Sequence, residues 1–238
     1  MKKVFVLACS VGLMSAAFAQ TNSAKTNPGG LYLKGGVNLA NISVSPSGNV
    51  DEAKMLTSFH VGAVADLRLA SFLSFQPGLV VTGKGSKTEI YTTNSTTDNY
   101  YKIKTNPIYL ELPANFVFKA PISTGSNLYF GAGPYVAMGI AGKTKGEQRF
   151  LGVGSSYERD IEFNNDDPLT SQQEDASVNK LRRFDYGANA LAGIQTGKFM
   201  IGVNYGYGLS KIGSTESNNN DDNKNKHRVW SISLGFGL

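Results

Sequence analysis

The stretch FDYGANALAGIQTGKFMIGVNYGYGLS, from Phe184 to Ser210, decides the fold of this chain. In its second half, bulky residues at every second position share one face: Phe199, Ile201, Val203, Tyr205, Tyr207 and Leu209. The first half alternates in the same way, and this period of two is typical of a β-strand. Thr196, Gly197 and Lys198 join the two runs by a short glycine-containing connection, which is typical of a β-hairpin. Each run is about as long as the ~9–11 residues that a tilted strand needs to cross a bilayer. The stretch therefore predicts one hairpin of a membrane-spanning barrel.

The same alternation recurs along the rest of the chain and predicts six more strands, at residues 31–40, 59–69, 72–82, 108–118, 128–141 and 229–238. The connections between them alternate in length. Long polar loops are expected at 41–55, 83–99, 142–182 and 211–227, and the other connections are short turns. An up-and-down barrel has this pattern when all long loops leave from one side. The sequence therefore predicts an all-β fold, an eight-stranded antiparallel up-and-down transmembrane β-barrel over residues 31–238.

The N-terminal segment MKKVFVLACSVGLMSAAFAQ has the features of a secretory signal peptide. Lys2 and Lys3 precede an apolar run, and Ala17-Phe18-Ala19 is a small-residue cleavage site. We expect a signal peptide at 1–19, cleaved on export, and a flexible lead at 20–30. Cys9 is the only cysteine, and a lipoprotein site there is disfavoured because the preceding residues fit such a site poorly. Loss of the two lysines lowers the net charge from +5 to +3, which is too small to indicate binding to nucleic acid.

The two faces of the predicted strands differ in charge. One face carries no charged residue in any strand core, and we assign this face to lipid. A charge there at mid-bilayer would cost ~2–4 kcal/mol. The opposite face is expected to form a polar network inside the barrel: Lys34, Asp66, Arg68, Glu111, Asn115 and Asp185. Lys34 and Asp66 lie on adjacent strands, so we expect them to pair. Eight strands leave an interior just large enough for side chains, which predicts a plugged barrel and no general diffusion pore.

Four stretches resemble one known family: KGGVNLANIS in the first strand, LSFQPGLVVTGKGSK, YLELPANFVFK and the alternating carboxyl end. With the signal peptide, they are similar to the PorT-like outer-membrane β-barrel proteins of Bacteroidetes. The resemblance implies an integral protein of the cell outer membrane, with the membrane lipid and the outer-membrane assembly machinery as partners. It also implies an assembly signal at the end of the chain, in Trp230, Ile232, Leu234, Phe236 and Leu238. One branch of the family assists protein secretion, a role that these residues do not assign.

Candidate chemistry is sparse, so a non-enzymatic protein without metal or cofactor is expected, with surface loops in structural or binding roles. The mature chain has two histidines, His60 and His227, and a hydrolase would need one of them beside a hydroxyl nucleophile such as Ser231 and a carboxylate such as Glu111. No Gly-x-Ser-x-Gly elbow or phosphate loop is present. Carboxylates at 158–167 and 218–222 could hold a hard cation, but solvated loops have the same composition. Two alternatives stay open: an outer-membrane lipid-modifying enzyme and a soluble lipocalin-like carrier with the two faces inverted.

Overall fold

The computed structural model describes residues 29–43, 55–92, 99–150, 153–163, 180–212 and 226–238. The expected signal peptide and nearly all of the expected lead lie outside these residues. The described strands are β1 (Leu31–Ser43), β2 (Leu56–Ala65), β3 (Leu67–Arg68), β4 (Leu73–Gly83), β5 (Ser86–Thr92), β6 (Asn99–Ser123), β7 (Ser126–Phe150), β8 (Val153–Asp160), β9 (Glu162–Phe163), β10 (Lys180–Leu181), β11 (Phe184–Thr196), β12 (Phe199–Gly208) and β13 (Lys226–Gly237). Across the same ranges, no helix is both long and apolar enough to cross a membrane.

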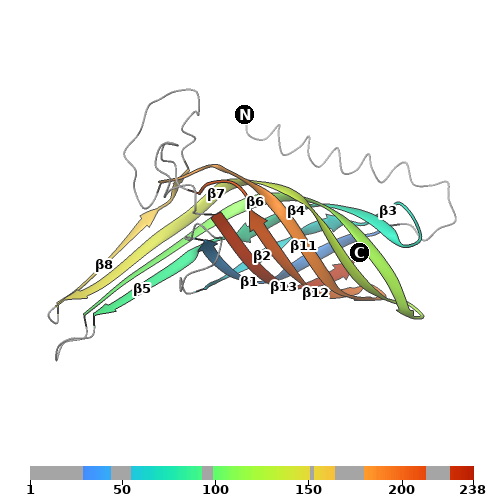
Figure 1. Ribbon diagram of the computed structural model, residues 1–238, viewed down its shortest axis with the longest axis horizontal. Coiled ribbons are helices and arrows are strands. Elements are labelled where there is room, and N and C mark those ends of the chain that lie inside the picture. Colours follow the sequence, from blue (N-terminus) through green and yellow to red (C-terminus); the bar gives the residue numbers. More distant parts are fainter. Residues whose placement is uncertain (1–28, 44–54, 93–98, 151–152, 164–179, 213–225) are drawn as a thin grey trace, which may run out of the picture.

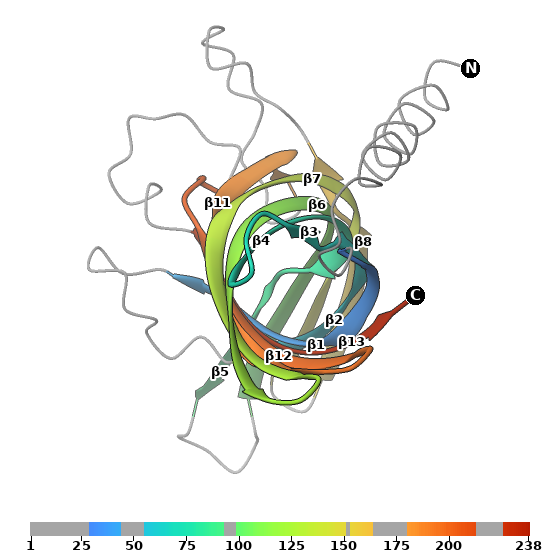
Figure 2. The same ribbon diagram turned by 90° about the vertical axis from the view of Figure 1, so that its right-hand side faces the viewer.

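The strand pairings close into a ring. The order β4-β2-β1-β13-β12-β11-β7-β6 returns to β4 because β4 also pairs with β6, and Figure 2 looks into this ring. Every pairing around the ring is antiparallel. The predicted all-β antiparallel fold is confirmed. Closure also explains how the ring strands satisfy their backbone hydrogen bonds without leaving an open edge.

The hairpin that decided the prediction is present as β11 and β12. Thr196 pairs with Phe199 across a two-residue turn, and Gly197 in that turn has a φ of 55°, a conformation that favours glycine. The inward glycines of this hairpin make room for large rings. A Cβ added to Gly202 would lie 2.2 Å from the hydroxyl oxygen of Tyr129. The narrow interior therefore depends on small residues facing large ones.

Several expected loops are strands in part, and these boundaries need correction. β6 and β7 each run for 25 residues, and β5 and β8 pair with their far ends. The four form a sheet that protrudes from one end of the ring (Figure 1); we call it the protruding sheet and that end the protruding end. The opposite end, with its tight turns, is the turn end. The expected loops 83–99 and 142–182 thus contain β5 and β8, and β1, β2 and β13 extend into or border 41–55 and 211–227. The sequence pattern did not predict these strands because their residues are mostly polar, and a strand that borders no apolar layer needs no apolar alternation.

Burial around the ring is inverted relative to a soluble protein. Large apolar side chains are exposed on the outside, among them Leu33, Val37, Phe59, Val61, Leu112, Phe116, Val136, Ile140, Ile201, Val203, Ile232 and Leu234. Polar and charged side chains are buried inside, among them Asn38, His60, Asp66, Glu111, Asn115, Lys119, Asp185 and Asn189. We call the first set the apolar belt. It includes the predicted C-terminal residues, since Trp230, Ile232, Leu234, Phe236 and Leu238 are all exposed.

Candidate functional site

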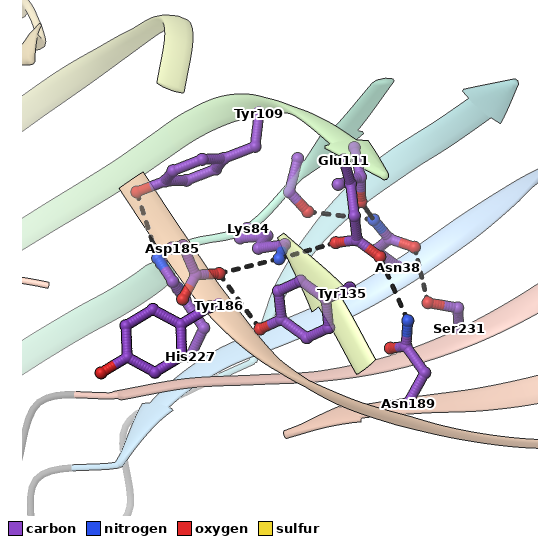
Figure 3. A network of polar contacts seen from close by, with 12 residues as sticks. Asn38, Lys84, Tyr109, Glu111, Tyr135, Asp185, Tyr186, Asn189, His227 and Ser231 are labelled. Atoms are coloured by element: carbon purple, nitrogen blue, oxygen red, sulfur yellow. Dashed lines mark hydrogen bonds and ion pairs between the residues drawn. The ribbon is translucent and has the colours of Figure 1, made fainter. Parts of the chain in front are cut away.

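A cluster of buried charges lies inside the ring towards the protruding end. The Lys84 Nζ atom lies 2.7 Å from Glu111 Oε2 and 2.9 Å from Asp185 Oδ2, and Figure 3 shows it between the two carboxylates. Lys84 follows β4, Glu111 is on β6 and Asp185 is on β11. The cluster therefore ties together three separate parts of the chain. One lysine between two carboxylates leaves a local excess of negative charge, which the surrounding groups must stabilise.

Hydrogen-bond donors surround these carboxylates. Tyr135 donates from its hydroxyl to Asp185 Oδ2 at 3.1 Å, and Ser210 donates to Asp185 Oδ1. Asn189 donates from its amide to Glu111 Oε1 at 3.3 Å. The Lys84 ammonium also lies 3.9 Å from the centre of the Tyr135 ring, which is a favourable cation–π distance. A buried ion pair persists only when its remaining polar atoms are satisfied, and this shell of donors meets that requirement.

A second network lies deeper in the interior, around His60. Asn38 Nδ2 donates to Phe59 O at 3.0 Å and to Thr82 Oγ1 at 2.8 Å, so its Oδ1 is the acceptor. His60 Nδ1 is 2.7 Å from that Oδ1 and must carry the ring proton of the neutral imidazole. His60 Nε2 then accepts a hydrogen bond from the Ser233 hydroxyl, at 2.8 Å. The chain of amide, imidazole and hydroxyl is thus fixed in one direction.

This arrangement has the order of groups that activates a serine nucleophile. The cavity beside His60 and Ser233, however, has a volume of about 70 Å³, enough for only a few water molecules. An ester with an acyl chain does not fit there. Ser231 and Glu111, the groups that the disfavoured hydrolase would need, are not assembled either, because Ser231 donates to Asn38 at 2.8 Å and Glu111 pairs with Lys84. His227 is buried near Tyr109, with 3.3 Å between Nε2 and the hydroxyl.

A third set of polar contacts lies inside the ring at the turn end. Lys119 pairs with Asp66, and Gln76 donates to the same carboxylate at 3.1 Å. Asp66 therefore does not pair with Lys34, contrary to our prediction. The register explains the error, because Lys34 lies opposite Gly62, four residues before Asp66.

The predicted polar residues lie in three different places. Glu111 and Asp185 share the charge cluster with Lys84, whereas Lys34 and Asn115 line the small cavity beside His60. Asp66 is at the turn end. Arg68 does not belong to the buried network, since it is exposed on the two-residue strand β3. Arg68 lies opposite the inward-facing Ser74 and lines the pocket at the turn end with Asp66, so it keeps the predicted face but lies at the exposed rim.

Sequence reasoning missed the two lysines that pair with these carboxylates. Lys84 and Lys119 both fell in segments taken for a loop and a turn, although both are buried. One signal was available for each: Lys84 continues the even-numbered inward positions of β4, and Lys119 continues the odd-numbered inward positions of β6. A cation next to the end of an alternating run can still face the interior.

The protruding sheet has two different faces. Residues two apart share a face, and its outer face continues the outside of the ring through Ile108 and Ala141. That face carries charged residues on all four strands: Lys87, Glu89, Lys102, Lys104, Lys143, Lys145, Glu147, Arg149, Glu158 and Asp160. The other face combines the rings of Tyr101 and Tyr157 with polar side chains, among them Thr105, Thr144 and Arg159. There Tyr157 lies against Gly146, where an added Cβ would be 2.1 Å from the tyrosine ring, and its hydrogen bond with Tyr101 raises the pKa of Tyr101.

Charges on the outer face are partly paired. Glu158 bridges two lysines, with 2.5 Å to Lys143 Nζ and 2.7 Å to Lys145 Nζ. Hydrogen bonds from these lysines lower the pKa of the Glu158 carboxyl to about 2. Among the described residues, no group of three or more His, Cys, Asp or Glu side chains is placed to hold a metal ion. The other carboxylates that could hold a hard cation, at 218–222, lie outside the described residues.

A family model described as "Outer membrane protein beta-barrel domain" matches residues 18–214. No curated protein matches the sequence significantly. Among solved structures, the chain is similar to Ail, the attachment invasion locus protein of Yersinia pestis, at 16% identity over 89% of this chain and 99% of that chain, with a TM-score of 0.40. Neisserial surface protein A (NspA) is 12% identical over 87% of this chain and 97% of that chain, with a TM-score of 0.39. The N-terminal β-barrel domain of OprF from Pseudomonas aeruginosa is 9% identical over 88% and 99%, with a TM-score of 0.32.

Proposed function

Because this chain belongs to the family of outer membrane protein β-barrel domains, we propose that it is an integral, eight-stranded, up-and-down transmembrane barrel of the outer membrane. One observation carries the proposal: a closed ring of strands exposes its apolar side chains and buries its charged ones. In water this inversion would leave a large apolar surface uncovered, whereas in a bilayer the acyl chains cover it. A soluble lipocalin-like carrier would need the opposite arrangement.

The interior of the barrel is plugged, in this proposal, and does not serve as a general pore. The ion pairs of Lys84 with Glu111 and Asp185 cross the interior near the protruding end. The pair of Lys119 with Asp66 does the same near the turn end. Between them lies the small cavity beside His60. A hydrated solute would have to break both sets of contacts to pass.

The protruding sheet is assigned to the cell exterior, where it would act as a non-enzymatic binding surface. Outer-membrane barrels have short turns on the periplasmic side and long connections outside, and the protruding sheet lies opposite the tight turns (Figure 1). Binding residues are commonly carried on segments held by a rigid scaffold. The proposal also includes membership of the PorT-like branch and export by a cleaved signal peptide. The assembly machinery would then recognise the exposed, alternating C-terminal residues.

Heat-modifiable gel migration of the membrane-extracted protein tests the barrel. A closed barrel keeps its structure in cold detergent and migrates differently after boiling, so two bands are expected. Recovery in the soluble periplasmic fraction without detergent, or a single band under both conditions, would refute the proposal. Planar bilayer recordings test the plug, for which no steady conductance is expected. A permanently open channel would show that the charge clusters do not close the interior.

A further inference from the structure

Three lysines face one another in a single row across the protruding sheet. Lys87 on β5 pairs in register with Lys104 on β6, and Lys104 pairs with Lys145 on β7. Residues directly opposite across antiparallel strands have Cβ atoms about 5 Å apart, and like charges there are destabilising. A row of three ammonium groups therefore needs a compensating anion.

The chain supplies only part of that compensation. Lys87 pairs with Glu89 at 2.5 Å, and Lys145 shares Glu158 with Lys143. Lys104, in the middle of the row, has no carboxylate partner among the described residues. The row thus keeps excess positive charge at its centre, because both residues directly opposite Lys104 are cations, whereas the carboxylates of Glu89 and Glu147 lie opposite Lys102.

The position of the row relative to the apolar belt indicates what the anion is. Lys104 shares the outer face of β6 with Ile108, and four residues span about 13 Å along a strand. Ile140 on the neighbouring strand is exposed and belongs to the belt. The cations therefore stand just beyond the apolar surface and on the same wall. An amphiphile whose acyl chains lie on the belt would bring its charged head group to this height.

We propose that the lysine row binds the phosphate groups of an anionic glycolipid in the outer leaflet of the membrane. The inference rests on the proposed function, since it needs the belt in lipid and the protruding sheet outside. Ammonium groups bind phosphate through charge-assisted hydrogen bonds. A soluble polyanion would have no reason to bind beside acyl chains, so continuity with the belt favours a lipid.

Binding of bisphosphorylated lipid A to the detergent-purified full chain tests this assignment. The triple variant Lys87→Gln, Lys104→Gln, Lys145→Gln is expected to bind at least tenfold more weakly than the unchanged protein. The corresponding triple arginine variant keeps the charge and should retain binding. Lys198→Gln, a single change in the β11–β12 turn at the other end, is the control and should leave binding unchanged. Dephosphorylated lipid A should bind the unchanged protein as weakly as the triple glutamine variant binds the phosphorylated form.

Three results would overturn the proposal: equal affinity of the triple glutamine variant, equal affinity for dephosphorylated lipid A, or tight binding of inorganic polyphosphate without binding of lipid A. Every variant is also tested for heat-modifiable migration. If the unchanged protein shows the normal migration shift but does not bind lipid A, only the proposed lipid binding by the lysine row is rejected. If the unchanged protein shows no shift, the proposed barrel itself is rejected. In lipid-free detergent, Lys104→Gln should not destabilise the fold, since it removes repulsion. A loss of stability there would indicate a structural role and contradict the assignment.

Discussion

Removal of the Lys84 ammonium group is expected to destabilise the barrel strongly. In the variant Lys84→Met, the carboxylates of Glu111 and Asp185 lose their shared cation in a buried site, where both side chains are largely shielded from solvent. Breaking one buried ion pair by removing a partner costs about 3–5 kcal/mol. Since Lys84 pairs with two carboxylates, we expect a loss of about 5 kcal/mol in the free energy of unfolding. That loss corresponds to more than a thousandfold change in the folding equilibrium.

Equilibrium unfolding in urea from lipid vesicles, followed by tryptophan fluorescence, measures this loss. The control Lys198→Met removes an exposed lysine and should change stability by less than about 0.5 kcal/mol. The triple variant Lys84→Met, Glu111→Gln, Asp185→Asn removes every charge of the cluster and should recover at least half of the loss, because no charge is left unpaired. A loss below about 1 kcal/mol for Lys84→Met, or a triple variant less stable than the single one, would refute the reasoning.

On the belt, Ile232→Lys should lower the free energy of unfolding from vesicles by about 2–4 kcal/mol, because it places a charge on the lipid face. The control Ile122→Lys, next to the β6–β7 turn, should lower it much less. Equal losses for the two variants would contradict the assignment of the belt. Gly62→Ala should destabilise by about 1–3 kcal/mol, since its Cβ would lie 2.2 Å from a backbone oxygen. Gly35→Ala, with its nearest atom at 3.6 Å, is the tolerated control in the same thermal denaturation assay. For Glu158, NMR titration should give a pKa of about 2 against an ordinary value of 4.5. Because the folded pKa is the lower one, the stabilisation by its two lysines is complete above about pH 4.5 and is lost as the pH falls towards 2; an unshifted titration would exclude the bridge.

Much of the ring could be predicted from alternation alone, because lipid outside and a narrow interior impose opposite demands on successive residues. Glu111 and Asp185 were assigned to the inside on this basis, and both are buried there. Arg68 keeps the inward face opposite Ser74 but is exposed at the turn end, and the predicted partner of Asp66 was wrong, because the face of a residue does not determine its depth in the barrel. Lys84 and Lys119 were missed because they lie beyond the apolar part of their runs.

The sequence by itself determined which residues face lipid and which face inward, since a strand's side chains alternate whatever its partners are. Only the tertiary structure decided which inward charges meet, because that depends on the stagger between strands and on the closing pair of β4 with β6. It also decided that polar segments at 86–92 and 153–160 are strands. Outside the apolar region their backbone pairing with β6 and β7, which no local pattern encodes, holds them in place.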